Sequence, residues 1–112
     1  MSSEIDLLEF GRLTGDLRWL SLTAGVFLRQ LPQWRSDLAA AVSVQDVGLQ
    51  LDLLHKMKGS CYAVAAYKIG ENINSAELGH AAGTPLPLSL LLRHLERVET
   101  ELRAILANAP TK

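Results

Sequence analysis

The segment HKMKGSCYAVAA, residues 55–66, gathers the polar side chains of most chemical interest in this sequence. His55 offers an imidazole that is neutral near pH 7 and can act as a nucleophile. Lys58, three residues later, can reach over the same helical turn and balance negative charge. Gly59 costs a helix up to about 1 kcal/mol relative to alanine, but it clears space beside the ring. An open imidazole beside an ammonium suits attack on a phosphoryl group, which depends mainly on positioning and charge balance.

The alternative for His55 is an ordinary solvated side chain, which is the commoner role of a lone surface histidine beside lysines. In a helix through this segment, the apolar stripe is centred near Leu54, Met57 and Cys61. At about 100° per residue, His55 lies roughly 130° from that centre and therefore points to solvent. Cys61 lies within the stripe, so we expect a small buried hydrophobic residue and not a reactive thiol. Gly59 favours a function, because its backbone cost has no local structural reason.

Three further side chains, Asp52, Lys56 and Tyr62, lie around His55 and are predicted to contact a partner protein. For Tyr62, an ordinary half-exposed tyrosine is an equal alternative. His80 and His94 lie in different predicted helices, without the ligand partners that a metal site needs. The Glu-x-x-His motif of di-iron bundles occurs only once, at Glu77 and His80, and the predicted inner faces carry no carboxylate. We therefore expect no metal site.

The segment LLHKMKGSCYAVAAYKI resembles the signature of histidine-containing phosphotransfer (HPt) domains of bacterial phosphorelays. That signature runs histidine, any residue, an apolar residue, lysine and glycine, then a small residue and, further on, a Gly-Ala pair. His55, Met57, Lys58 and Gly59 match it position by position, and Ala66 matches the alanine of the pair. The resemblance implies that His55 is phosphorylated, that Lys58 assists and that Gly59 grants access.

The sequence departs from the HPt pattern at two positions. Cys61 stands where a serine or another small residue is common, and Ala65 replaces the glycine of the pair. Both changes exchange one small residue for another, so we expect them to affect packing more than chemistry. The segment after Lys68 matches weakly, and no functional residue is inferred from it.

The resemblance implies a phosphorelay intermediate that accepts a phosphoryl group from a receiver-domain aspartate and passes it to another receiver. Its partners would be response-regulator receiver domains and a sensor histidine kinase, with magnesium bound only in the receiver. The resemblance implies a phosphotransfer protein without a nucleotide-binding or kinase site. In agreement with this, the sequence contains no Gly-x-x-x-x-Gly-Lys-[Ser/Thr] loop that could bind a nucleotide. Two alternatives stay open: a helical adaptor that never carries phosphate, and the phosphoacceptor domain of a chemotaxis-type histidine kinase.

Apolar residues recur at spacings of three and four throughout, so we predict an all-α fold. The expected helices cover residues 4–13, 16–42, 46–68, 71–82 and 88–106, with Ser3 capping the first helix and GTPLP as the clearest break. Short connections force neighbouring helices to run antiparallel. The prediction is one domain over residues 1–112, an antiparallel up-down four-helix bundle with a short additional N-terminal helix.

The inner faces of the long helices follow from the same spacing. The second helix should bury Leu17, Leu20, Ala24, Phe27, Leu31, Trp34, Leu38 and Ala41. The third should bury Val47, Leu51, Leu54, Met57, Cys61 and Val64, and the last should bury Leu88, Leu91, Leu95, Val98, Leu102 and Ile105.

Composition limits the remaining function classes. Of 112 residues, 48% are hydrophobic and only 5% aromatic, which predicts an aliphatic core. A net charge of −1 argues against nucleic acid as a partner, since phosphate binding needs clustered lysine and arginine. The single cysteine fits a reducing compartment. With no signal sequence and no membrane-spanning run of about 18–20 apolar residues, we expect a cytoplasmic monomer.

Overall fold

The computed structural model describes residues 4–14 and 18–108, which form helices and no strand. The helices are α1 (Leu7–Thr14), α2 (Arg18–Ser43), α3 (Val47–Ala63), α4 (Tyr67–Ala81) and α5 (Leu88–Asn108). Within this part of the chain, no helix combines the length and the apolar character needed to cross a membrane.

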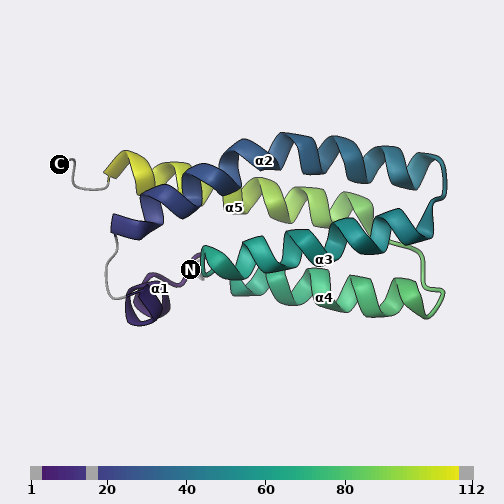
Figure 1. Cartoon of the computed structure of the whole chain (residues 1–112), viewed down its shortest axis with the longest axis horizontal. Coiled ribbons are helices and arrows are strands. Elements are labelled where there is room, and N and C mark those ends of the chain that lie inside the picture. Colours follow the sequence, from purple (N-terminus) through teal and green to yellow (C-terminus); the bar gives the residue numbers. More distant parts are fainter. Residues whose placement is uncertain (1–3, 15–17, 109–112) are drawn as a thin grey trace.

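The four long helices run alternately up and down and lie along one another, as Figure 1 shows. The short helix α1 lies at the end of the bundle where α2 begins. The predicted architecture is thereby confirmed: an antiparallel four-helix bundle with a short additional N-terminal helix.

The core forms along the stripes that the apolar spacing predicts. On α2, every predicted inward residue from Leu20 to Ala41 is buried, while Leu17 lies outside the described residues. Phe27 and Trp34 meet edge to face, with ring centroids 5.3 Å apart. Each fully buried large side chain contributes about 1.5–3 kcal/mol to the free energy of unfolding. Four predicted core positions differ: Val47 is exposed at the very start of α3, and Leu51, Leu88 and Ile105 are only partly buried.

The turn between α2 and α3 confirms the predicted connection. Gln45 takes a positive φ of 58°, and Asp46 caps α3 by accepting a hydrogen bond from the backbone N–H of Leu49 at 3.0 Å. Side-chain caps of this kind satisfy a donor that the helix leaves free. The buried side chain of Gln50 then donates to the carbonyl of Ala41 at 3.0 Å, which ties α3 to the end of α2.

The first helix begins later than predicted. It starts at Leu7 and not at residue 4, and its cap is Asp6, whose carboxylate accepts from the N–H of Glu9 at 3.0 Å. The predicted cap, Ser3, lies outside the described residues.

Residues 4–6 precede α1 without helical structure, and α5 binds the first two of them. A single carboxylate, that of Glu101, accepts hydrogen bonds from the backbone N–H groups of Glu4 and Ile5, both at 2.9 Å. The carboxylate of Glu4 in turn lies 2.5 Å from Nε2 of the buried His94. These contacts attach the N-terminal segment to the bundle.

The junction between α3 and α4 differs from the prediction of a helix over 46–68. Helix α3 ends at Ala63, because Ala65 takes the left-handed conformation with φ 58°. The N–H of Ala66 donates to the carbonyl of Cys61 at 2.9 Å, and the N–H of Ala65 donates to that of Tyr62 at 3.0 Å. This pair of bonds is a Schellman motif, which usually carries glycine at the left-handed position.

Helix α4 therefore begins at Tyr67, earlier than the predicted residue 71. Gly70, Asn72 and Asn74, which suggested a weak region before this helix, lie inside it. At its other end α4 stops at Ala81, and α5 begins at Leu88 as predicted.

Candidate functional site

The residues that the sequence singles out share one exposed stripe of α3. The stripe consists of Asp52, His55, Lys56, Gly59 and Tyr62, all of which are exposed. The side chain of His55 is 73% exposed, so the prediction that this ring faces solvent is confirmed. The opposite face of the helix, with Leu54, Met57 and Cys61, is completely buried.

The side chain of Lys58 does not lie on this stripe and extends towards α4. Its ammonium nitrogen Nζ lies 3.0 Å from Oδ1 of Asn74 and 3.0 Å from Oε1 of Glu77. The Lys58 side chain is only 18% exposed, so its charge is held in a partly sheltered position between α3 and α4. The lysine was predicted to reach back over its own turn, and the structure instead shows it bound between the two helices.

Glu77 joins the lysine to the histidine. Its second oxygen, Oε2, lies 3.6 Å from Nδ1 of His55, which is within ion-pair range of a protonated ring and too long for a hydrogen bond. The site thus contains a carboxylate placed between an imidazole and an ammonium. The ring turns Nδ1 towards Glu77, and this carboxylate is the functional candidate that the sequence reasoning missed.

The position of the turn explains why Glu77 and Asn74 were missed. In an antiparallel pair of helices, partners lie at equal distances from the turn. His55 and Glu77 are placed symmetrically about Ala66, as are Lys58 and Asn74. A prediction that placed the turn at residues 64–66 would have brought His55 opposite Glu77 and Lys58 opposite Asn74. The helix predicted over residues 46–68 contains this turn and so did not indicate either pair.

Gly59 leaves the surface beside His55 open. A Cβ atom added at this position would meet no neighbouring atom within 4 Å. The fold of this chain therefore does not require glycine here, and the open space lies on the stripe that carries the imidazole.

Tyr62 is held in place by α4. Its ring packs over Gly70, where an added Cβ would lie 2.8 Å from Cδ1 of the tyrosine. The ring also contacts that of Tyr67, with centroids 5.9 Å apart. Tyr62 is 37% exposed, so it presents a fixed, half-covered aromatic surface on the same stripe as His55.

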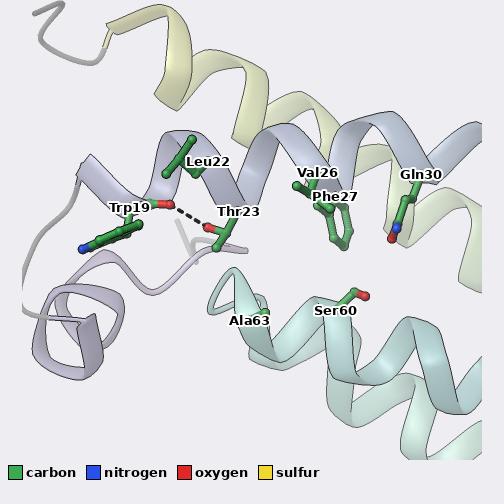
Figure 2. Close-up of a pocket in the computed structure, with 8 residues that line it drawn as sticks. All are labelled: Trp19, Leu22, Thr23, Val26, Phe27, Gln30, Ser60 and Ala63. Carbon is green, nitrogen blue, oxygen red and sulfur yellow. Dashed lines mark hydrogen bonds between the residues drawn. The ribbon is translucent and has the colours of Figure 1, made fainter.

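An apolar groove of about 340 Å³ runs between α2 and α3, beside this stripe (Figure 2). Its lining is uncharged and consists of Trp19, Leu22, Thr23, Val26, Phe27, Gln30, Ser60 and Ala63. Trp19 and Leu22 are more than half exposed, at 53% and 60%. Trp19 thus lies at the rim of the groove, whereas Trp34 is buried in the core, as predicted.

The other histidines have structural partners. Nδ1 of the buried His94 accepts a hydrogen bond from the amide of Asn72 at 2.9 Å, so Nε2 is left to donate to Glu4. Nδ1 of His80 lies 3.0 Å from the carbonyl of Thr84. Across residues 4–14 and 18–108, no three histidine, cysteine or acidic side chains are grouped as metal ligands.

The thiol of Cys61 is buried and unreactive at neutral pH. Cys61 is fully buried, and this burial raises the pKa of its thiol to about 12. A thiol of this kind carries almost no thiolate at neutral pH, so it is neither a nucleophile nor a ligand in this state.

Comparisons of the chain with models of protein families, with curated proteins and with solved structures found no match.

Proposed function

We propose that this chain is a phosphorelay intermediate of the HPt type, which takes a phosphoryl group on His55 from a receiver-domain aspartate and passes it to another receiver. The observation that supports this most is the exposed ring of His55, with the ammonium of Lys58 fixed nearby and open space over Gly59. A protein that hands over phosphate needs its nucleophile accessible to the partner's active site and held on rigid elements, and a helix of the bundle provides both.

The orientation of the ring selects the reacting nitrogen. Because Nδ1 faces Glu77, the lone pair of Nε2 is the one that can approach an incoming phosphorus atom. In the proposed step, Nε2 forms the new bond to phosphorus and the bond to the donor aspartate breaks. The electron pair of that bond returns to the aspartate carboxylate. Transfer to the next receiver is the reverse step with a different carboxylate.

Lys58 and Gly59 have separate roles in this proposal. The ammonium of Lys58 balances the negative charge on the phosphoryl oxygens. Gly59 keeps the approach free, so that the partner's acidic, magnesium-containing pocket can close over the ring. Asp52, Lys56 and Tyr62 surround the ring and serve as docking residues, and the neighbouring groove offers an apolar contact beside them.

The decisive experiment is transfer from phosphorylated receiver domains of the same genome. We expect the wild type to acquire an acid-labile, base-stable phosphate and His55→Gln to acquire none. Because this side chain is exposed, helical content by circular dichroism should be unchanged and the free energy of unfolding should stay within about 0.5 kcal/mol. Equal labelling of the variant would refute the assignment.

The same assay separates the alternatives. A helical adaptor would bind a receiver or a kinase domain and stay unlabelled. The phosphoacceptor domain of a chemotaxis-type kinase would be labelled by an ATP-binding kinase domain with ATP, and not by receivers.

Two variants test the neighbours of His55. Gly59→Glu should block transfer without unfolding the bundle, whereas Gly59→Ala fits the open space and should transfer far better than the glutamate variant. Equal transfer by both would refute the access role. Lys58→Ala should lower the transfer rate more than the docking affinity, and an effect on affinity alone would contradict the charge-balancing role.

A further inference from the structure

We propose that the outer face of α2 is a self-association surface, through which two copies of this chain form a weak antiparallel dimer. The surface is a seam of four residues, Trp19, Leu22, Val26 and Arg29, all of which are exposed on the first half of α2. This inference goes beyond the proposed function and does not depend on the phosphorylation of His55.

The seam has the spacing of a helix-pairing face. Its members follow one another at intervals of three, four and three residues, which is the spacing of the a and d positions of a coiled coil. Trp19, Leu22 and Val26 are between 46% and 60% exposed, whereas Ala24 and Phe27 on the inner face are buried. The bundle's own core therefore leaves this line of large apolar side chains for a second helix to cover.

The order of the residues makes the seam complementary to a reversed copy of itself. In an antiparallel pair of α2 helices centred at the level of Ala24, Leu22 lies opposite the partner's Val26, and Trp19 lies opposite the partner's Arg29. An apolar side chain thus meets an apolar one, and a guanidinium meets the face of an indole in a cation–π contact. The twofold symmetry supplies each of these contacts twice.

Arg29 is placed along the helix surface for this contact. A Cβ atom added at Gly25 would lie 3.4 Å from Nη1 of Arg29, so the guanidinium is folded back over the preceding turn of α2. The glycine leaves room for it there, and the charge lies beside the seam.

Charge favours a second copy as the occupant. The groove beside the seam is lined by uncharged residues, so this face offers no cluster of charges that would select an acidic or a strongly basic protein. The net charge of the chain is only −1, so two copies repel each other little.

The size of the seam indicates a weak association. An aromatic side chain buries about 150–250 Å² when it is fully covered, so three half-exposed large side chains offer on the order of 300 Å². A stable interface buries about 800 Å² per partner. We therefore expect a dissociation constant above about 1 µM, the weak end for interfaces of standard size, and a monomer in dilute solution.

A second copy on the seam would also cover the groove between α2 and α3, because the three apolar seam residues form its α2 wall (Figure 2). Ser60, on the α3 wall, directly follows Gly59 in the sequence. A second copy and a receiver docked over His55 would therefore compete for this side of the molecule.

Sedimentation equilibrium of the full, unphosphorylated chain tests the dimer from about 10 µM to about 1 mM. The average mass of the wild type should rise from that of one chain towards that of two. Leu22→Glu should raise the dissociation constant at least about tenfold, because the symmetric contact would bury two unpaired carboxylates. Leu90→Glu is the matched control, since Leu90 is 66% exposed on α5, outside the seam, and the same change there should leave the dissociation constant unaltered.

Arg29→Gln tests the pairing within the dimer. It removes both cation–π contacts and alters no core residue, so the dissociation constant should rise about five- to thirtyfold. NMR gives a second readout, because the sequence contains only two tryptophans. The indole N–H signal of the exposed Trp19 should move with protein concentration, while that of the buried Trp34 should stay in place.

A wild type that remains a monomer up to about 1 mM would overturn the proposal. Equal dimerisation of the wild type and Leu22→Glu, or loss of the dimer in Leu90→Glu, would do the same by placing the contact elsewhere. An unchanged dissociation constant in Arg29→Gln would rule out the antiparallel arrangement. Movement of the Trp19 signal only after a receiver domain is added would assign this face to the receiver and not to a second copy. None of these results affects the labelling test of His55.

Discussion

Ala65 ends the helix that carries His55 in a conformation that costs a residue with a Cβ about 1–2 kcal/mol. Its φ is 58°, and its side chain is buried. The surrounding bonds hold it there: two Schellman bonds close the end of α3, and the N–H of Asp6 donates to the Ala65 carbonyl at 2.9 Å. This is also the position at which the HPt signature has glycine.

We therefore predict that Ala65→Gly is nearly neutral, because relief of the left-handed conformation offsets the lost methyl group and the greater entropy of the unfolded chain. The matched control is Ala39→Gly, at an exposed site inside α2, which should lower the free energy of unfolding by about 1 kcal/mol. Urea denaturation of both variants measures the difference. Equal destabilisation would show that Ala65 is not strained.

Cys61 gives a second prediction for a single side chain. Because burial raises the pKa of its thiol to about 12, alkylation by iodoacetamide at pH 8 should require unfolding. Labelling should be slow in buffer and rapid in concentrated urea, with mass spectrometry as the readout. Labelling in buffer at the rate of a free thiol would contradict the buried position.

Among the elements, α4 shows what the sequence could not predict. Gly70, Asn72 and Asn74 suggest a break when only local preferences are considered, yet each has a tertiary partner: the Tyr62 ring, His94 and Lys58. The real break falls among alanines, the best helix formers, which carry no turn signal.

The long helices were predictable because their apolar stripes are regular, and the exposed face of α3 followed from the same spacing. That placed His55 in solvent and Cys61 in the core. The Lys58–Glu77 contact was not predictable, because it depends on the register of α3 against α4 and hence on the position of the turn.

The packing of α3 against α4 can be tested through Gly70 and Tyr62. Gly70→Ala should not stabilise the wild type, because the added Cβ would collide with the tyrosine ring. In a Tyr62→Ala background the same change should raise the free energy of unfolding by about 0.5–1 kcal/mol, the helix preference of alanine over glycine. A double-mutant cycle measured by urea denaturation gives the coupling free energy between the two substitutions. Additive effects would mean that the Tyr62 ring does not occupy the space beside Gly70.

Across the whole molecule, an ion pair joins the first and last long helices. Nη2 of Arg35 on α2 donates to Oε1 of Glu99 on α5 at 2.6 Å, and Arg103 binds the other oxygen at 3.0 Å. The hydrogen bond from Arg35, followed by that from Arg103, lowers the pKa of Glu99 although partial burial opposes the shift. A carboxylate with a lowered folded-state pKa stabilises the fold above its unfolded pKa and loses this effect as the pH falls.

Glu99→Gln should therefore lower the free energy of unfolding by about 1 kcal/mol at pH 7. The difference in free energy of unfolding between wild type and variant should narrow as the pH falls below about 4.3, which is the pKa of a glutamate in an unfolded chain. Urea titrations from pH 7 to pH 3 measure this gap. A gap that stays constant over the range would show that the ionised carboxylate is not what stabilises this contact.

The attachment of Glu4 and Ile5 to Glu101 has a consequence for the order of the chain itself. The start of the described chain therefore lies beside its last helix, α5. A circularly permuted version, joined across this point and opened in the loop at residues 82–87, should keep every helix in place. The surroundings of His55 would then be the same although the chain would start with α5.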